Sequence, residues 1–391
     1  MSERARSAPR PFRVALDPAV VEDVRRRVSA AALPDAISEG WEHGTDTTYV
    51  RAFRDHWVER YDWPSAEARL NAHPQFIASI DGLDVHFYWE RATRDAAPAI
   101  VFTHGWPGSV LEFVHVIEKL AHPERFGGDV EDGFDVVVPS LPGFGFSGKP
   151  RVPIGPGDTA RVWRRLMTEI LGYRRFFAQG GDLGSMVTAY LGGEHADVVE
   201  AIHLNFVPVR EVPAAEMTLE ERSWNHAAHS FRSVELDYFR LLMHKPQTLS
   251  FALCDSPLGC AAWMLEKLRS WSDCAGDLDT AFTKDDLITN VMLYVATRRA
   301  DSSLWFYRGF HLEGERTHPG AAVGVATGVA VFPRDMLNGR PPRSWVERDY
   351  RLARWTEMPR GGHFACLEQP DLFVEDVRAF FREREHAGAR T

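Results

Sequence analysis

The sequence predicts an α/β fold with a mostly parallel sheet, a helical insertion, and an N-terminal segment that wraps around the rest. Three observations lead to this prediction. Beyond residue 75, short apolar runs typical of buried strands alternate with amphipathic runs typical of helices, which indicates a parallel sheet with covering helices. Between residues 209 and 305 the alternation stops and the patterns are helical. Residues 1–75 also show helical patterns, with no strand of their own.

The N-terminal segment contains two candidate helices. Asp17 can cap a helix that continues to Val28 and has valines on one face, and Asp46 can cap a second helix with aromatic residues at helical spacing. Because such apolar faces must be buried, we expect these helices to pack against a neighbouring domain. We interpret the aromatic residues as part of this docking surface, in preference to a ligand site.

Strand patterns begin at Gln75. The run FIASIDGLDVHFYWERA predicts two strands joined by a turn at Asp81 and Gly82, and the runs PAIVFTHGWPGS and FDVVVPSLPGFGFSG each predict a strand that ends in a loop. The run RVWRRLMTEILG then predicts an amphipathic helix. In open α/β sheets the functional site lies beyond the carboxyl ends of the strands, so we expect the loops at 104–109 and 143–147 to meet there.

The stretch FFAQGGDLGSMVTAY, residues 176–190, predicts a strand, a cramped turn and an amphipathic helix from Ser185. Asp182 is at the centre of the turn, with Gly180 and Gly184 two residues before and after it, a spacing that allows a strained turn to project one side chain. A carboxylate there can attack an sp³ carbon and form an alkyl ester that water cleaves, which suits epoxides and alkyl halides. The pattern alone fits equally well an aspartate that caps the helix.

The helical insertion contains three clear helical runs, SFRSVELDYFRLLMH, PLGCAAWMLEKLRSWSD and DDLITNVMLYVATRR. Asp285 or Asp286 is a candidate cap for the third run. We expect most of the large apolar residues of this insertion to pack against one another, and a minority to face a cavity and exclude water from it.

Composition and charge limit the classes of function. The 391 residues are 45% hydrophobic and 12% aromatic, which is enough to bury a large core. The net charge of −10 and the lack of a long basic cluster argue against a nucleic-acid partner and leave a small organic molecule as the expected partner. The four cysteines show no C-x-x-C spacing, so we expect reduced thiols, a cytoplasmic location and no metal site.

The sequence predicts no membrane segment. The N-terminal run MSERARSAPRPFRVAL lacks the apolar core of a signal peptide, and no apolar run is long enough to span a bilayer. We therefore expect a soluble protein. The aromatic-rich N-terminal segment is also compatible with a homodimer.

Four loop motifs together resemble a known family. They are HGWPG at 104–108, GFGFS at 143–147, GGDLG at 180–184 and GGHFACLEQP at 361–370, and they look like the epoxide hydrolases of the α/β-hydrolase superfamily. The runs YDWPSAEARLN and FIASIDGLDVHF resemble the leading segment of the microsomal and juvenile-hormone branch. The resemblance implies an α/β-hydrolase fold with a helical cap and no cofactor. The implied divisions are an N-terminal segment (1–95), a first core part (96–208), the cap (209–305) and a second core part (306–391).

The resemblance also implies a catalytic role for three residues. Asp182 matches the nucleophile, and His363, in the GGH loop, would take a proton from the water that attacks the ester. Asp335 would orient His363. It follows the run GVAVFPR, which is typical of a strand and its exit, although many relatives carry glutamate there. Glu347 and Asp349 are the alternative acids, and we interpret them as solvated charges.

Four further residues complete the implied site. The backbone N–H groups of Trp106 and Leu183 would stabilise the oxyanion formed during ester hydrolysis. Many relatives carry tryptophan at the place of Leu183, so this residue is expected to alter the pocket wall. Tyr238 and Tyr307, near the two ends of the helical insertion, would donate a hydrogen bond and a proton to the opening ring.

The sequence thus predicts a cofactor-independent epoxide hydrolase that forms a vicinal diol through an aspartyl ester. A haloalkane dehalogenase would share the aspartate and the histidine, but its halide site usually includes a tryptophan where this chain has Leu183. A catalytically silent small-molecule-binding protein on the same scaffold is the third alternative. For the biological role, detoxification and a resemblance to the epoxide hydrolases of actinomycete enediyne antibiotic pathways both stay open.

Overall fold

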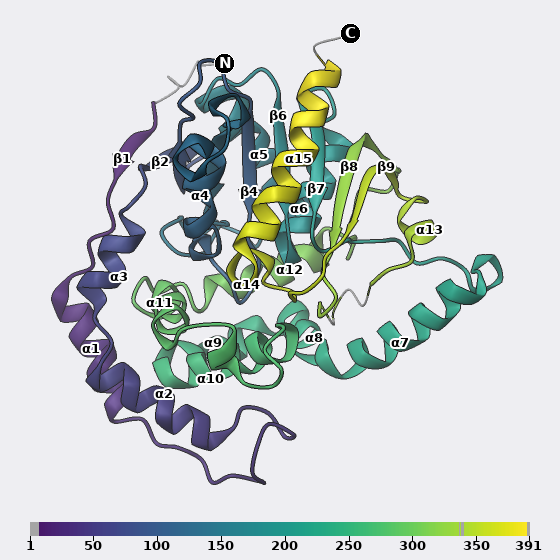
Figure 1. The fold of residues 1–391 in the computed structure, drawn as a ribbon. Coiled ribbons are helices and arrows are strands. Elements are labelled where there is room, and N and C mark those ends of the chain that lie inside the picture. Colours follow the sequence, from purple (N-terminus) through teal and green to yellow (C-terminus); the bar gives the residue numbers. More distant parts are fainter. Residues whose placement is uncertain (1–7, 336, 338–339, 389–391) are drawn as a thin grey trace.

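A nine-stranded sheet forms the centre of the computed structural model, which describes residues 8–335, 337 and 340–388 (Figure 1). Within these residues the strand order is β1-β2-β3-β5-β4-β6-β7-β8-β9. The strands are β1 (Arg10–Phe12), β2 (Gln75–Ile80), β3 (Leu83–Glu90), β4 (Ala99–Thr103), β5 (Asp135–Pro139), β6 (Phe176–Gly180), β7 (Val199–Leu204), β8 (Val323–Val331) and β9 (Tyr350–Glu357). This order places β4 and β6, which precede two of the predicted site loops, in the middle of the sheet.

Most of the sheet is parallel. The strands from β5 through β4, β6, β7 and β8 to β9 are parallel to their neighbours, whereas β1, β2 and β3 form an antiparallel edge. The predicted parallel sheet is confirmed, and so is the hairpin turn, where Asp81 and Gly82 have φ angles of 53° and 81°. The prediction that residues 1–75 lack a strand is wrong. β1 pairs with β2, but its three residues are too few to show strand alternation in the sequence.

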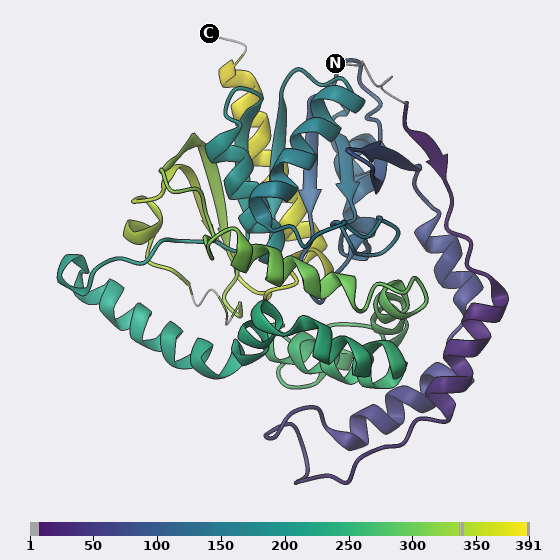
Figure 2. The same ribbon diagram turned by 180° about the vertical axis from the view of Figure 1, so that it is seen from behind.

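Helices cover both faces of the sheet. One face carries α4 and α15 (Figure 1), and the other carries α5 and α6 (Figure 2). The bounds are α4 (Val114–Ala121), α5 (Pro156–Arg165), α6 (Asp182–Glu194) and α15 (Pro370–Gly388), with the short helices α13 (Arg343–Val346) and α14 (Ala365–Glu368). Short 3₁₀ turns occur at η1 (Val110–Phe113), η2 (Pro123–Phe126), η3 (Val130–Asp132), η5 (Ala214–Glu216), η6 (Leu278–Thr280) and η7 (Ser302–Leu304), and the π-helical turn η4 (Leu166–Ile170) extends α5.

Helix α6 differs from the predicted amphipathic helix that begins at Ser185. It begins at Asp182, directly after the turn, and every residue from Leu183 to Gly192 is buried. The cause is packing on both sides, because α6 contacts α5 as well as the strands β4, β6, β7 and β8. A helix enclosed in this way has no face in water, so its residues are mostly small or apolar all round.

A layer of helices, which we call the cap, covers the carboxyl ends of the parallel strands. It consists of α7 (Leu219–Glu235), α8 (Asp237–His244), α9 (Pro246–Asp255), α10 (Pro257–Trp271), α11 (Lys284–Val295) and α12 (Trp305–Leu312). Helix α7 extends outwards from the others (Figures 1 and 2). Helices α8 and α12, which carry the two candidate tyrosines, pack against each other.

Two details of the cap differ from the sequence prediction. The run SFRSVELDYFRLLMH is two helices, because the chain breaks at Leu236 between α7 and α8. Helix α11 is capped by Thr283, whose hydroxyl accepts the N–H of Asp286, and neither Asp285 nor Asp286 is the cap. Both acidic residues lie in the first turn, where they complement the positive end of the helix.

A membrane-spanning helix was not expected, and no single helix of the described residues is long and apolar enough to cross a membrane. The consecutive helices α9 and α10 pass the length and composition test only as a pair, and they are bent by 117° relative to each other. Both belong to the cap, and each carries buried residues such as Leu253 and Leu265.

An N-terminal arm of three helices lies along the outside of the cap (Figures 1 and 2). Its helices are α1 (Pro18–Ser29), α2 (Thr47–Glu59) and α3 (Trp63–Leu70). Asp17 and Asp46 cap α1 and α2, as predicted. The arm contacts α10 and α11, and an ion pair of 2.8 Å joins Arg69 to Asp286. The arm therefore connects the antiparallel edge of the sheet to the cap.

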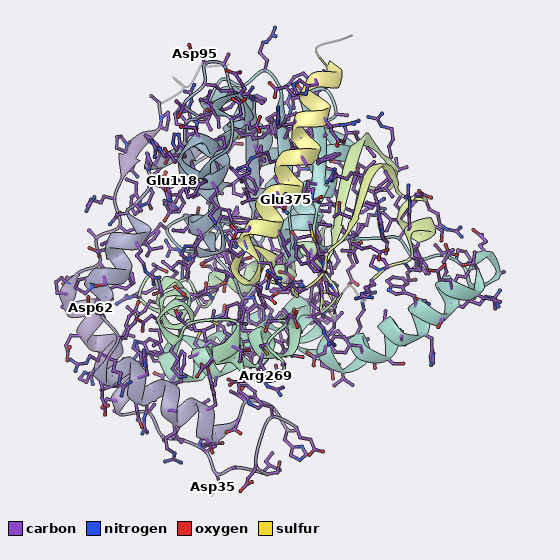
Figure 3. The ribbon with its side chains drawn as sticks, viewed as in Figure 1. Asp35, Asp62, Asp95, Glu118, Arg269 and Glu375 are labelled. Atoms are coloured by element: carbon purple, nitrogen blue, oxygen red, sulfur yellow. The ribbon has the colours of Figure 1, made fainter. Side chains whose placement is uncertain are left out.

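One continuous cluster of buried apolar side chains reaches from the arm through the sheet into the cap. Figure 3 shows side chains filling the space between these elements, with the exposed acidic residues Asp35 and Asp95 at the periphery. A small second cluster joins Trp224 on α7 to Trp345 on α13. This second cluster anchors the outer helix α7 to the sheet domain.

Candidate active site

Asp182 lies at the sharp turn between β6 and α6. Its φ of 47° is in the left-handed region, which costs a residue with a Cβ roughly 1–2 kcal/mol. The turn is also closely packed, since a Cβ on Gly184 would collide with the carbonyl oxygen of Thr103 and a Cβ on Gly180 would collide with the backbone of Gly184. The predicted strand, cramped turn and helix are therefore all present, with glycine at the two places where only glycine fits.

The alternative in which Asp182 caps α6 is wrong. The N-cap residue of α6 is Gly181, and no side chain caps this helix. The carboxylate of Asp182 has other partners, because Oδ1 accepts the N–H of Trp106 at 2.7 Å and Oδ2 lies 3.2 Å from Nε2 of His363. Gly105 leaves room for this carboxylate, since a Cβ there would overlap it.

His363 lies between two carboxylates that come from distant parts of the chain. Its Nε2 faces Asp182, and its Nδ1 lies 3.1 Å from Oδ1 of Asp335 in the turn after β8. Both His363 and Asp335 are buried. The structure thus brings together Asp182, His363 and Asp335, the three residues for which the family resemblance implies a catalytic role.

The interpretation of Glu347 and Asp349 as solvated charges is correct for one of them only. Glu347 is exposed and pairs with Arg343. Asp349 is buried, because its carboxylate accepts the backbone N–H of Arg210 at 2.7 Å and the side-chain Nε of the same residue at 2.6 Å. Neither carboxylate contacts His363, so Asp335 is the acid placed to orient it.

The two carboxylates change the acidity of His363. Burial alone lowers the pKa of His363, but the charges of Asp335 and Asp182 and the hydrogen bonds to them outweigh burial and raise this pKa to about 10. The imidazole is therefore protonated at neutral pH while Asp182 carries its negative charge. Any reaction that removes the charge of Asp182 removes part of this stabilisation and lowers the pKa of His363.

The loop that carries His363 is held by its backbone. Glu368 accepts the N–H groups of Gly362 and Phe364, each at 2.9 Å, and the N–H of His363 donates to the carbonyl oxygen of Trp271 at 2.9 Å. Trp271, on the cap helix α10, also packs edge-on against the imidazole ring. These contacts fix the position of the ring independently of the bonds that the ring itself makes.

Trp106 and Leu183, the predicted oxyanion-hole residues, both border Asp182. The Trp106 N–H already donates to the carboxylate. Leu183 is buried in the wall of the neighbouring cavity, and its N–H is one of the first in α6, where N–H groups have no acceptor within the helix.

Tyr238 on α8 and Tyr307 on α12 are both buried beside the nucleophile loop. Their ring centroids are 5.9 Å apart, and both rings contact the indole of Trp106. Burial, together with the negative charge of Asp182, raises the pKa of each phenol well above its usual value, so both stay protonated. The two hydroxyls are close enough for each to affect the pKa of the other. Among the described residues the Tyr307 hydroxyl nevertheless forms no hydrogen bond, so it is available to a substrate.

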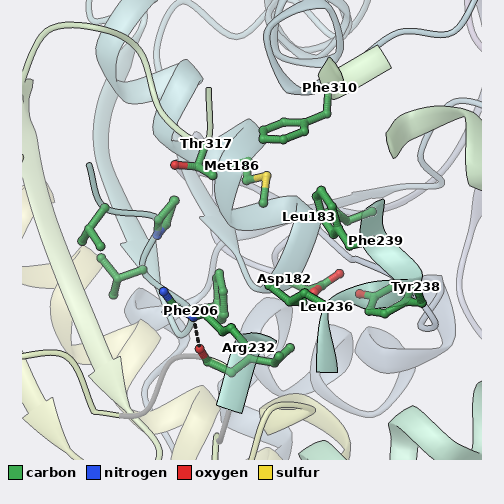
Figure 4. A pocket seen from close by; sticks show the side chains of 14 residues that line it. Asp182, Leu183, Met186, Phe206, Arg232, Leu236, Tyr238, Phe239, Phe310 and Thr317 are labelled. Carbon is green, nitrogen blue, oxygen red and sulfur yellow. Dashed lines mark hydrogen bonds between the residues drawn. The ribbon is translucent and has the colours of Figure 1, made fainter. Parts of the chain in front are cut away.

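A cavity of about 220 Å³ opens above Asp182 (Figure 4). Figure 4 shows the carboxylate between Tyr238 on one side and Phe206 on the other. The lining is mainly apolar, as is usual for small-molecule sites. It comprises Asp182, Leu183, Met186, Phe206, Val207, Pro208, Val209, Arg232, Leu236, Tyr238, Phe239, Phe310, Thr317 and Leu337.

A much smaller cavity of about 10 Å³, roughly the space of one water molecule, is also lined by Asp182. Asp182, His363, Trp106 and Glu112 are among the residues that line it. Burial, and then the charge of Asp182, raise the pKa of Glu112 to about 8, so this carboxyl group is protonated at neutral pH.

The sequence prediction missed Glu112 and Glu368. Glu112 lies in the run VLEF just after the HGWPG motif, and a charged residue within an apolar run that follows a site loop is an indication of a buried functional group. Glu368 belongs to the quoted motif GGHFACLEQP, but the sequence does not reveal that its carboxylate binds backbone N–H groups of the same loop.

The described residues contain no group of three or more His, Cys, Asp or Glu side chains that could hold a metal ion. The four cysteines form no disulfide bonds.

Two family models match the chain. The model described as the epoxide hydrolase N terminus matches residues 9–113, and the model described as the alpha/beta hydrolase fold matches residues 98–228. The first covers the arm and the start of the sheet, and the second covers the loops that carry Trp106 and Asp182.

Relatives match nearly the whole chain. A Stigmatella aurantiaca protein that is named as an epoxide hydrolase is 39% identical over 95% of this chain and 84% of its own length. Epoxide hydrolase 1 of Sus scrofa is 33% identical over 95% of this chain and 88% of its own. The solved structure of Aspergillus niger epoxide hydrolase is 29% identical, superposes with a TM-score of 0.85, and covers 97% of both chains.

Proposed function

The chain belongs to the epoxide hydrolase family and has the α/β-hydrolase fold. On that premise we propose that it hydrolyses its substrate through a covalent ester on Asp182. As an epoxide hydrolase it converts a small-molecule epoxide and water to a vicinal diol. The observation that carries the proposal is the environment of the carboxylate. One oxygen of Asp182 is held by the Trp106 N–H, the other faces His363, and the residue lines both a substrate-sized cavity and a water-sized cavity.

In the first step, a carboxylate oxygen of Asp182 attacks a ring carbon. The bond between that carbon and the ring oxygen breaks, and its electron pair goes to the oxygen. Tyr238 and Tyr307 donate hydrogen bonds to this oxygen, and one of them transfers its proton. The raised pKa values keep both phenols protonated before the ring opens. A phenol can still give its proton to the alkoxide, because an alkoxide is a stronger base than a phenolate.

In the second step, water attacks the ester carbonyl carbon. Ester formation has removed the charge of Asp182, so the pKa of His363 has fallen from about 10 and the imidazolium releases its proton, which replaces the proton that the phenol gave to the alkoxide. The neutral imidazole can then accept a proton from the water. The N–H groups of Trp106 and Leu183 stabilise the tetrahedral oxyanion. Collapse of this intermediate breaks the bond between the carbonyl carbon and the substrate oxygen, which takes the proton of the new carboxyl group. The diol is released, and Asp182 is again a carboxylate beside the protonated His363.

Glu112 supports the second step by holding the water. Its neutral carboxyl group lines the small cavity, which His363 and Asp182 also line. A protonated carboxyl group can both donate and accept a hydrogen bond, so it can orient a water molecule without competing for the proton.

The covalent route is tested by a single turnover in ¹⁸O-labelled water with enzyme in excess. We expect the first diol to contain no label, because its new oxygen comes from Asp182, and we expect the label in the peptide that contains Asp182. Mass spectrometry of diol and peptide gives both results. Label in the diol of the first turnover would show that water attacks the epoxide directly, and it would overturn the proposal.

The roles of the tyrosines are tested by stopped-flow measurement of the two steps. We expect Tyr238→Phe and Tyr307→Phe each to slow ester formation roughly tenfold or more, and the double variant to slow it about 10²- to 10⁴-fold, because the alkoxide loses its proton donors. Ester cleavage should change much less. A larger effect on cleavage than on formation would remove both residues from the proposed role.

In the same measurement, Glu112→Ala is expected to have the opposite pattern, slowing ester cleavage roughly tenfold and leaving ester formation nearly unchanged. Glu112→Gln is the matched control. Because the acting form of Glu112 is neutral at neutral pH, the neutral amide should restore most of the rate. If the amide is as harmful as alanine, Glu112 acts as a carboxylate and the water-holding role is wrong.

The alternatives are less well supported. A dehalogenase of the predicted type would have a side-chain N–H beside the nucleophile, where this chain has Leu183, and a halide needs no proton from Tyr238 or Tyr307. A silent binding protein has no use for the buried pair of Asp335 and His363. The role in antibiotic biosynthesis or in detoxification stays a prediction.

We also keep a cytoplasmic location and a homodimer as proposals. The four cysteines without disulfide bonds agree with the first. The aromatic residues of the arm do not support the homodimer, because Phe53 and Trp57 are buried against this chain. The exposed apolar residues Leu219 and Val234 on the outward-pointing α7 are a better-supported contact surface.

A further inference from the structure

The substrate cavity contains a cation that the proposed mechanism does not use. Arg232, on the cap helix α7, lines the same cavity as Asp182 (Figure 4). Among the described residues that line this cavity, Arg232 is the one with a positive charge, and most of the others are apolar. A charged side chain in such a place calls for a physical explanation.

The contacts of Arg232 leave most of its donors unused. Its Nε donates to the carbonyl oxygen of Leu337 at 3.0 Å, and its guanidinium lies 5.6 Å from the ring centroid of Trp224. In the described part of the chain, neither Nη nitrogen has a hydrogen bond or an ion pair, and neither is sealed from solvent. Four of the five N–H donors of the guanidinium are therefore available to a ligand.

The surroundings do not neutralise the charge. Burial lowers the pKa of Arg232, and the negative charge of Asp335 opposes this effect. Asp335 itself is bonded to His363, so its carboxylate is already committed to the catalytic histidine. A guanidinium stays charged in proteins, and a partly buried charge without an ion-pair partner is costly unless a ligand supplies one.

We propose that Arg232 binds a carboxylate of the substrate, and that the enzyme acts on epoxides joined to a carboxylate through an apolar spacer. The inference rests on the proposed function, because Asp182 then marks the epoxide end of the cavity. Arg232 lines the same cavity, and its planar fork can bind a carboxylate with two parallel hydrogen bonds. The apolar side chains of Phe206, Leu236 and Phe239 line the space for the spacer.

The charge of Arg232 also offsets a repulsion. An anionic substrate must approach the negative carboxylate of Asp182, and in a cavity of low polarity this repulsion is stronger than in water. A positive charge in the same cavity lowers that cost for an anion but gives a neutral epoxide no comparable benefit. Selectivity for the anion is therefore the property that distinguishes this proposal from a merely structural role of Arg232.

The test compares kcat/KM for 4-(oxiran-2-yl)benzoate and for its methyl ester, and for the corresponding pair with a longer phenylpropanoate spacer. We expect the wild-type enzyme to prefer the carboxylate in at least one pair. In Arg232→Gln the ratio of kcat/KM for carboxylate to that for ester should fall by about ten- to hundredfold, the usual effect of losing a hydrogen bond to a charged group. Arg232→Lys keeps the charge but loses the fork, so an intermediate ratio is expected.

Arg222→Gln is the matched control. Arg222 is on the same helix and its Nε also donates to a backbone carbonyl oxygen, that of Met217, but its side chain is exposed and does not line the cavity. Its replacement should leave the ratio unchanged. If Arg232→Gln lowers kcat/KM equally for carboxylate and ester, Arg232 has a packing role and the proposal is overturned. It is also overturned if the wild-type enzyme does not prefer the carboxylate at either spacer length.

Failure of the proposed function can be recognised separately. If none of these epoxides is hydrolysed, the result counts against the proposed function, and calorimetry with 3-phenylpropanoate and its methyl ester then tests the anion site alone. Binding of the carboxylate that weakens about tenfold or more in Arg232→Gln would support the site. Binding that is equal in the two proteins would overturn it.

Discussion

Replacing Asp182 with alanine is expected to abolish diol formation, with kcat lowered by roughly 10⁴-fold or more, because the proposed mechanism has no other nucleophile. The fold should survive. The strained turn depends on Gly180 and Gly184, which are unchanged, and alanine takes the left-handed conformation at a cost of only about 1–2 kcal/mol. The measurement is the rate of diol release, with circular dichroism and a thermal melt to establish that the variant is folded.

Asp376→Ala is the matched control for this prediction. Asp376 is also a buried aspartate paired with a buried histidine, since its Oδ2 lies 3.0 Å from Nε2 of His203, but the pair is between β7 and α15 and does not line the substrate cavity. Its loss should lower the melting temperature and leave kcat near the wild-type value. Turnover at the wild-type rate in Asp182→Ala would contradict the assignment of the nucleophile.

Local features of the fold could be predicted because their causes are local. Asp17 and Asp46 cap the helices that follow them, and the turn at Asp81 and Gly82 joins two strands, because caps and tight turns depend on a few neighbouring residues. The sequence motifs also led to the epoxide hydrolases, and the relatives confirm that family. The parallel sheet followed from the alternation of strand and helix patterns.

Features that depend on distant partners could not be predicted in the same way. Asp349 and Glu347 look alike in the sequence, and only the position of Arg210 on another segment explains why one is buried and the other exposed. Helix α6 was expected to be amphipathic, but the neighbouring α5 removes its solvent face.

The same limit applies to the site. Asp335 and His363 were chosen from a family resemblance and their order in the chain, whereas the distance of 3.1 Å between them is a property of the fold. Glu112 and Arg232 have no motif that marks them, because their importance lies in the cavities that they line. Their roles therefore stay proposals that the variants described above can test.

The ester itself should become visible when its hydrolysis is blocked. We expect His363→Gln, incubated with styrene oxide, to gain the full mass of the epoxide on the peptide that contains Asp182, because glutamine cannot accept the proton of the attacking water. The loop should keep its place, since Glu368 and the Trp271 carbonyl hold the backbone on both sides of residue 363. Intact-mass and peptide mass spectrometry give the gain and its location.

The conditions and controls of this experiment follow from the site. At about pH 6, Glu112 stays protonated because burial, the largest cause of its raised pKa, persists after Asp182 has lost its charge in the ester. It therefore cannot replace His363 as the base and shorten the life of the ester. The double variant Asp182→Ala, His363→Gln should gain no mass. A parallel incubation with a haloalkane separates the alternatives, because a gain from the haloalkane alone, without its halogen, would indicate a dehalogenase. A lack of any adduct across a panel of epoxides that the wild-type enzyme hydrolyses would contradict the covalent mechanism, because the base would be lost while the nucleophile is intact.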